Sequence, residues 1–310
     1  MKRRRPISRC LRIKLPPNRN GKMYTLDYHG DDYAVSPNNS SRMLELIDSG
    51  QLDSISIIAN MSHFDECMAE LNRHWDKWAK KPLISVHINL IDGMLLSQDN
   101  APQNRTWGSL FVSSHIPGRS RQRLKNEIKE EIKAQISRVC DALCVKLPLR
   151  LDSHVHTHMI PVVFEAMTEA VDELGLKKDL EFIRNSREPL FMFFITKGIC
   201  GTFPAVNVIK NIILNILSHR VSAYCRRNSL PQTMLWGLIM SGHMDEERVK
   251  KLSPRMQEYA KRKDRYLEIL CHPGIVATSE KSEEFGPDDL NFLLSRDRDV
   301  EYHMISSLNK

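Results

Sequence analysis

The amino-acid sequence predicts an α/β fold in which parallel strands alternate with helices packed outside them. Short apolar segments recur along the chain, and amphipathic segments with recognisable helix caps separate them. At 310 residues and 41% hydrophobic composition, the chain can bury a large core within one domain. This alternation is typical of either a (β/α) barrel or a doubly wound sheet.

The N-terminal half is predicted to alternate three strands with two helices. Ser36 suits a helix cap, Pro37 suits the first helical position and Gly50 suits the stop. A polar connection over 91–119 is too long for a simple turn, so we predict a lid or substrate loop there. The predicted elements are a strand over 23–29, a loop over 30–33, a helix over 37–49, a strand over 54–59, a helix over 62–79 and a strand over 83–90.

The C-terminal half continues the pattern with longer helices. Ser120 is placed to cap a charged amphipathic helix that runs to about Cys144. Polar segments are expected after the last strand. The further predictions are a helix over 161–174, a strand over 180–184, an irregular aromatic segment over 185–204, a helix over 206–226, and strands over 234–239 and 265–271.

Ionisable side chains occupy every second position in Asp152, His154, His156 and His158. The apolar alternation of Lys146–Leu151 leads into them, so we predict one strand that carries all four on the same face. Three imidazoles and a carboxylate are costly to bury unless they bind something. Both groups are common ligands of first-row metals, which favours a metal or acid/base site. A solvated face or a row of structural histidines is the alternative.

Other unusual polar residues fall near the C-terminal ends of predicted strands. Asp31 and Asp32 follow the first strand, His87 lies in the third, and His272 ends the last. In parallel α/β folds the site forms at these strand ends, so we expect the residues to converge. Each has an alternative: a turn for the two aspartates, a buried structural role for His87 and an ordinary loop start for His272.

The net charge of +7 is concentrated in residues 1–20, which carry eight Lys and Arg and no acid. Residues 1–21 are therefore predicted to be a flexible basic arm ahead of a single domain over 22–310. The arm lacks interleaved aromatic residues, so a nucleic-acid partner is not expected.

Cysteine usage and hydropathy bear on location. The seven cysteines are scattered and form no Cys-x-x-Cys pair, which is typical of a reducing cytoplasm. The sequence has no apolar run of about 18 residues and no apolar segment behind its basic start. We therefore expect a cytoplasmic protein without a membrane span or a signal peptide.

Five segments resemble, in order, motifs of the YdjC-like (ChbG/HpnK) carbohydrate deacetylases. The His-rich segment, similar to the family's Asp-Ser-His-x-His-x-His signature, is the most specific of them. The likeness runs from about residue 22 to 276, with His29-Gly30 and Tyr33-Ala34 where the family usually has Asn-Ala and Phe-Gly. The matching segments are 28–37, 54–60, 85–90, 152–159 and 267–274.

This resemblance implies a divalent-metal hydrolase that removes acetyl from an N-acetylated sugar or oligosaccharide, on a (β/α) barrel-like fold. By the match, Asp32, His87 and His154 would bind the metal, Asp31 would be the general base and His272 the general acid. The family implies Mg, whereas two imidazoles favour a later metal such as Zn, and Mn and Co also fit. A homodimer is a further implication of the resemblance.

Several other residues are candidates for orienting a ligand or binding substrate. One of Asp152, His156 and His158 is expected to orient a metal ligand. Glu268, near the end of the last strand, could do the same or pair with an arginine inside the barrel. The two arginines resemble the family's strand-five arginine and could hold substrate or Asp31, or form an internal ion pair. These candidates are Asp152, His156, His158, Glu268, Arg184 and Arg187.

Two functions of other classes fit parts of the sequence. A metal-dependent oxygenase could use the same two histidines and one carboxylate, but it needs neither Asp31 nor His272. A non-catalytic carbohydrate or polyanion-binding protein could use the basic arm. Trp107 and Trp236 could stack on sugar rings or belong to the core.

Overall fold

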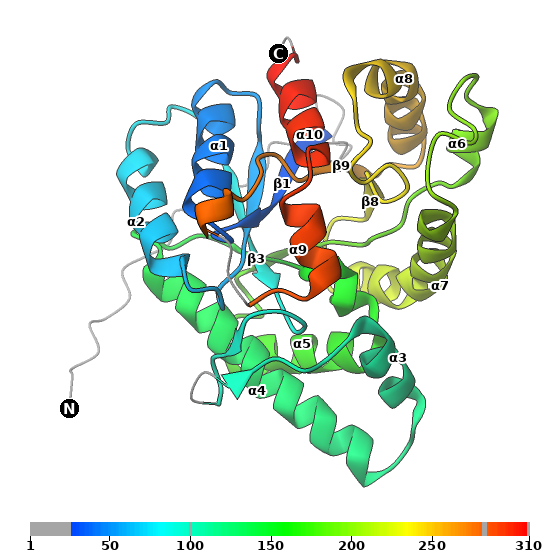
Figure 1. Cartoon of the computed structure of the whole chain (residues 1–310). Coiled ribbons are helices and arrows are strands. Elements are labelled where there is room, and N and C mark those ends of the chain that lie inside the picture. The colour runs from blue at the N-terminus through cyan, green and yellow to red at the C-terminus, as the bar shows by residue number, and fades with distance from the viewer. Residues whose placement is uncertain (1–25, 99–100, 281–283, 309–310) are drawn as a thin grey trace.

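The computed structural model describes residues 26–98, 101–280 and 284–308. Seven strands form one sheet, every neighbouring pair is parallel, and the sheet curls into a half-barrel with helices outside (Figure 1). The predicted barrel-like α/β fold is confirmed. In spatial order the strands are β7 (Leu180–Ile183), β6 (Leu149–Ser153), β3 (Leu83–Ile88), β2 (Ser54–Ile57), β1 (Leu26–Tyr33), β9 (Tyr266–Cys271) and β8 (Thr233–Trp236).

Helices surround the sheet, and a short antiparallel hairpin, β4 (Met94–Leu95) with β5 (Ala101–Pro102), stands apart from it. No described helix has the length and hydropathy that crossing a membrane requires. In Figure 1, α9 lies at the centre of the view, in front of the sheet. The helices are α1 (Pro37–Asp48), α2 (Phe64–Trp75), α3 (Trp107–His115), α4 (Arg119–Ala142), α5 (Pro161–Glu173), α6 (Phe191–Ile195), α7 (Ala205–Arg227), α8 (Glu246–Arg262), α9 (Pro287–Leu293) and α10 (Asp297–Ser306).

Alternate strand residues divide between a polar interior and an apolar exterior. In β2 the hydroxyls of Ser54 and Ser56 meet the interior residue His29, while Ile55 and Ile57 join the hydrophobic core under the helices. Successive side chains of a strand point to opposite faces, so this division follows from the sequence period. The polar interior of the half-barrel is the part of the fold that positions the candidate site.

Several predicted boundaries are wrong in detail. Ser36 caps α1 as predicted, accepting from the Asn39 N–H. β1 continues to Tyr33 through the predicted loop over 30–33, while residues 23–25 lie outside the described part. Helix α4 starts directly after Gly118, which has no side-chain cap, so the predicted Ser120 cap is wrong. The connection over 91–119 contains the hairpin and α3, and the predicted arm over 1–21 lies outside the described residues.

The His-rich segment is not a strand. β6 ends at Ser153, and residues 154–159 form a 3-10 turn in which Val155 and His156 adopt left-handed backbone angles, with φ of 41° and 59°. The Ser153 hydroxyl accepts from the His158 backbone N–H at 2.8 Å and bonds its Nδ1 at 2.6 Å, which closes the turn. The prediction that the three histidines share one face is therefore wrong.

Candidate active site

Two adjacent carboxylates reach the C-terminal end of the half-barrel from β1. Adjacent residues of a regular strand would point to opposite faces. Asp32 instead has a left-handed φ of 70°, and the pairing of β1 with β2 shifts register between Gly30 and Tyr33. The two carboxylates consequently lie near the same ring: Asp31 Oδ2 is 3.9 Å and Asp32 Oδ1 is 3.6 Å from His87 Nε2.

Asp32, His87 and His154 come together as expected. Their ligand atoms all lie within 4.8 Å of one another, with His154 Nδ1 3.2 Å from Asp32 Oδ1. The residues come from the ends of β1 and β3 and from the start of the 3-10 turn. Two imidazoles and one carboxylate suit a divalent metal and leave coordination positions open for other ligands. The donor set therefore fits the metal that the family resemblance implies.

A carboxylate faces the other nitrogen of each ring. His87 Nδ1 lies 2.6 Å from Asp152 Oδ1, and an ionised carboxylate only accepts, so this nitrogen carries the proton and Nε2 is free for a metal. His154 Nε2 lies 3.3 Å from Asp92 Oδ2, which leaves Nδ1 on the side of Asp32. The His87–Asp152 hydrogen bond fixes the tautomer and direction of a metal-binding histidine, and Asp92 faces the corresponding nitrogen of His154.

Asp92 was missed by the sequence reasoning. It lies in the turn after β3, where the Asn89 side chain accepts from the Asp92 backbone N–H, and its own Oδ1 accepts from Gly286 N–H at 3.0 Å. Asp289 of α9 lies beside Asp92 and His154 and completes a second group of possible metal ligands. The polar turn after a strand was the only local signal for this residue.

The charges around Asp32 and His154 favour opposite ionisation states. Burial alone would raise the pKa of Asp32, but His154 and Arg298 hold it well below its ordinary value. Burial alone would lower the pKa of His154, but Asp32 and Asp92 raise it well above its ordinary value. Arg298 from α10 donates to Asp32 Oδ2 at 3.0 Å and to the Gly274 carbonyl at 2.8 Å. Metal binding at His154 would release a proton.

Arg184 links three carboxylates inside the half-barrel. Its Nη1 and Nη2 each donate to one oxygen of Asp31 at 2.8 Å, and its Nε donates to Glu268 Oε1 at 2.7 Å. Asp152 Oδ2 lies 3.2 Å from Nη2. All four side chains are buried. Of the alternatives considered for Arg184, the contact with Asp31 is therefore present. Of those considered for Glu268, the pairing with an arginine inside the barrel is present.

His29, which the sequence reasoning passed over, carries two protons according to its hydrogen bonds. Ser54 Oγ donates to Asp27 Oδ1 at 2.5 Å, and Ser56 Oγ donates to Asp152 Oδ2. Each hydroxyl has a single proton, so each must accept from the His29 nitrogen that lies 2.6 Å away. The ring is therefore an imidazolium. The available sequence signal was that Asp27, His29 and Asp31 alternate along the first strand and so share one face.

The pKa values of His29 and Asp31 move in the directions these contacts require. Burial disfavours the charged imidazole, but Glu268 and Asp31 raise the pKa of His29 above its ordinary value. Burial disfavours the Asp31 carboxylate, but Arg184, His87 and His29 hold its pKa well below the ordinary value. Asp31 is therefore ionised near neutral pH.

The three remaining candidate histidines lie around the centre. His272 follows β9 directly at the rim, with its Nδ1 3.4 Å from Glu301 Oε2 and its ring against Phe292. His156 is partly exposed, and its Nδ1 lies 3.0 Å from Ser186 Oγ. His158 belongs to the wall, because its Nε2 bonds the Arg184 carbonyl at 2.9 Å.

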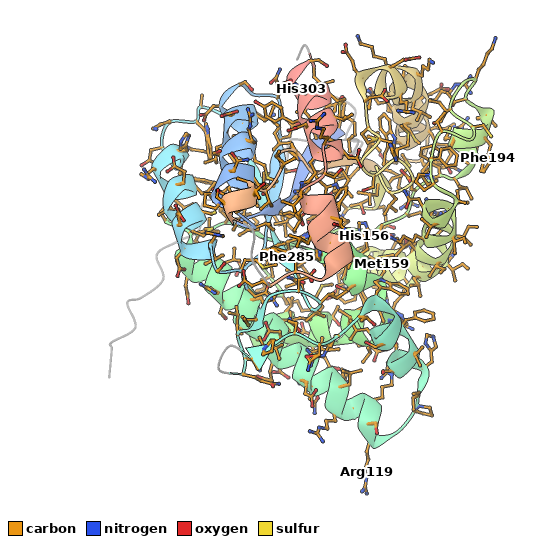
Figure 2. The ribbon with its side chains drawn as sticks, in the orientation of Figure 1. Arg119, His156, Met159, Phe194, Phe285 and His303 are labelled. Carbon is orange, nitrogen blue, oxygen red and sulfur yellow. The ribbon has the colours of Figure 1, made fainter. Side chains whose placement is uncertain are left out.

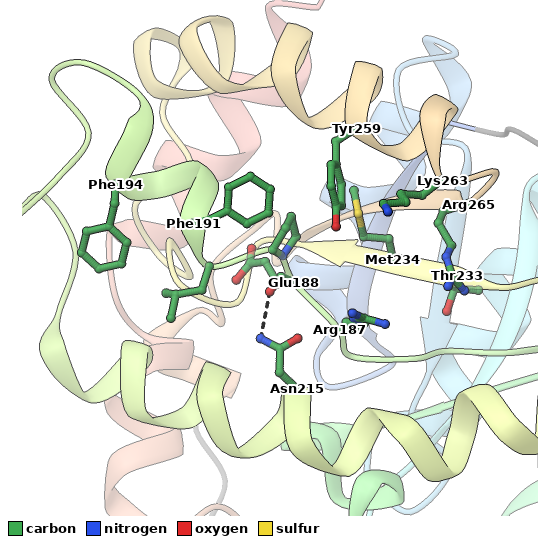
Figure 3. Close-up of a pocket in the computed structure, with 12 residues that line it drawn as sticks. Arg187, Glu188, Phe191, Phe194, Asn215, Thr233, Met234, Tyr259, Lys263 and Arg265 are labelled. Carbon is green, nitrogen blue, oxygen red and sulfur yellow. Dashed lines mark hydrogen bonds between the residues drawn. The ribbon is translucent and has the colours of Figure 1, made fainter.

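Arg187 lies outside the half-barrel. It lines a groove of about 680 Å³ between α6, α7 and α8 (Figure 3). The chain after β7 runs beside β8 here, with the Leu235 N–H donating to the Arg187 carbonyl at 2.9 Å. Of the two tryptophans considered for sugar stacking, Trp236 is fully buried and Trp107 stacks on Phe111.

Comparison with known proteins identifies the family. A solved structure from Enterococcus faecalis V583, described as a proposed cellobiose-phosphate cleavage protein, is 16% identical, with a TM-score of 0.48 over 93% of this chain and 97% of that chain. No curated protein matches the sequence. The family described as YdjC-like protein matches residues 26–309, which is most of the chain. The chain therefore belongs to the YdjC-like family.

Proposed function

We propose that this protein is a metal-dependent deacetylase that removes acetyl from an N-acetylated sugar or oligosaccharide. The observation that carries the proposal is the meeting of Asp32, His87 and His154, with Asp152 and Asp92 facing the two outer ring nitrogens. Membership of the YdjC-like family supports the carbohydrate substrate class.

The three ligands would present Asp32 Oδ1, His87 Nε2 and His154 Nδ1 to the metal. A divalent ion bound there supplies a Lewis acid for the acetamide carbonyl and lowers the pKa of water. Magnesium follows from the family resemblance, whereas the two imidazole donors favour zinc, with manganese and cobalt also compatible. The ligand set thus supports hydrolysis without selecting the metal.

Two further side chains carry the proton transfers in this proposal. Asp31, ionised and 3.9 Å from His87 Nε2, is placed to accept the proton of the attacking water. His272 at the rim would give a proton to the amine nitrogen that leaves. Arg184 holds both oxygens of Asp31 and so fixes the direction from which the carboxylate can accept.

Acetate release from a panel of N-acetylated sugars tests the proposal. We expect release that EDTA abolishes and that added Mg, Zn, Mn or Co restores to different extents. Asp32→Asn should abolish both release and metal binding, while the surface variant Asp65→Asn, at a side chain 86% exposed, should change neither. If the purified protein binds no divalent metal, the site assignment is wrong. If metal binds but oxygen is consumed with an organic substrate and no acetate appears, the protein is an oxygenase instead.

A further inference from the structure

The outer surface of α6 and α7 has an unusual distribution of apolar side chains. Of the eleven exposed large hydrophobic side chains in the described residues, seven lie between positions 191 and 216, and they are 45–66% exposed. Contiguous apolar patches on a soluble surface mark interaction sites more often than single exposed residues do. This α6–α7 surface consists of Phe191, Phe194, Ile195, Val206, Ile209, Ile212 and Ile216.

Helix α7 exposes apolar side chains as well as burying them. Its exposed Val206, Ile209, Ile212 and Ile216 recur at spacings of three and four residues, so they line one side. Its opposite, buried side includes the polar residues Asn211, Ser218 and Ser222, which the fold satisfies with hydrogen bonds. Leu214, Val221 and Cys225 pack into the core from the same buried side. The exposed apolar side chains of α7 are therefore additional to those that folding of the single chain buries.

Positive charge accompanies the apolar side chains. Between residues 191 and 227 the sequence has five Lys and Arg and no Asp or Glu. Lys197 and Lys210, close in sequence to the apolar residues, form no ion pair with another described residue. Helix α8 adds Arg255, which donates to the Ile195 carbonyl at 3.2 Å. Apolar side chains flanked by cations are typical of helices that lie on anionic membranes.

The groove shown in Figure 3 also combines apolar side chains with cations. Phe191 and Phe194 line it from α6 and Tyr259 from α8, while Lys263 and Arg265 stand at one end. Figure 2 shows Phe194 at the right-hand edge of the molecule. An apolar channel with a cationic end suits the acyl chain and anionic headgroup of a lipid.

We infer that the α6–α7 surface docks on an anionic lipid bilayer. A second molecule of this protein is the other occupant to consider. A two-fold dimer contact, however, brings the same surface of both molecules together. The 191–227 segment carries five cations and no acid, so a two-fold contact through this segment would bring no carboxylate of the segment against those cations. An anionic bilayer accepts the apolar side chains and the cations together. The inference does not depend on the proposed reaction.

Vesicle flotation with the full chain tests the inference. The probes are vesicles of phosphatidylcholine alone and of phosphatidylcholine mixed with phosphatidylglycerol. We expect binding to the mixed vesicles that weakens with added salt. Ile209→Ser/Ile216→Ser should lower the partition coefficient at least about tenfold, since two inserted side chains lose most of their apolar area. Lys197→Glu/Lys210→Glu should lower it as well.

The control variant Val112→Ser/Ile116→Ser changes two side chains that are 60% and 52% exposed on another surface, and it should bind like the wild type. Circular dichroism checks that each variant is folded. Absence of binding to the mixed vesicles would overturn the inference, as would unchanged binding by the Ile209/Ile216 variant. A wild-type dimer that this variant converts to a monomer would assign the surface to a second copy instead.

Discussion

Asp92→Asn tests how His154 is presented to the metal. Asp92 is 3% exposed, its Oδ1 accepts from the Gly286 N–H at 3.0 Å, and its Oδ2 faces His154 Nε2 at 3.3 Å. The asparagine must keep its carbonyl oxygen toward Gly286, because the opposite orientation would bring two donors together. Its NH₂ group then faces His154 Nε2 and favours the tautomer with the proton on Nδ1, the nitrogen that the metal needs.

We expect the metal affinity of Asp92→Asn to fall about 10- to 100-fold, the usual cost of removing an orienting carboxylate. That loss corresponds to about 1.4–2.7 kcal/mol. Calorimetric titration of the metal-free protein measures it, and Asp65→Asn is the exposed control. The Gly286 contact survives, so the metal-free protein should lose only the attraction between Asp92 and the protonated His154 ring, and its thermal unfolding midpoint should fall modestly. An affinity within twofold of wild type, in a folded variant, would refute the assignment of Nδ1 as the ligand atom.

Three further predictions address the interior and the rim. Arg184→Met should cost about 3–5 kcal/mol in urea unfolding, since three buried carboxylates lose their cation, and a cost below about 1 kcal/mol would contradict the ion-pair account. Burial, and after it Arg184, lower the pKa of His158 to about 4. The neutral ring's contribution to the free energy of unfolding should therefore be fully present above pH 6.5 and fall by up to about 3 kcal/mol as the pH drops toward 4. His158→Gln should flatten that slope in pH-dependent denaturation; an unchanged slope would assign it to other groups. His272→Gln should lower kcat for acetate release without weakening metal binding, and an equal loss of metal affinity would make His272 a ligand.

The strand positions of the site were predictable because they depend on period and topology. Asp31 and His87 lie near the ends of parallel strands that neighbour β2 on its two sides, so their convergence follows from strand order. The alternation that puts Ser54 and Ser56 in the interior was equally visible in the sequence. His29 was overlooked although it occupies the same face as Asp31.

The rest of the site depends on features that local patterns do not encode. Val155 is β-branched, and such residues rarely adopt a positive φ, so an alternating sequence gave no reason to expect the turn after Ser153. Arg298 reaches Asp32 from 266 residues away in sequence. Helix α8 carries Pro254 within it, which ordinarily marks a helix boundary. The Arg298 contact in particular comes from a distant segment, which no local pattern can show.

The site and the interior of the half-barrel form one electrostatic unit. Asp152 accepts from His87 on one oxygen, while Ser56 and Arg184 contact the other. Arg184 in turn holds Asp31. A substitution in this layer therefore changes a ligand's orientation and the proposed base at the same time. Asp92 contacts His154 outside that layer, which is why its replacement changes how His154 is held while it leaves the contacts among Arg184, Asp31 and Asp152 in place.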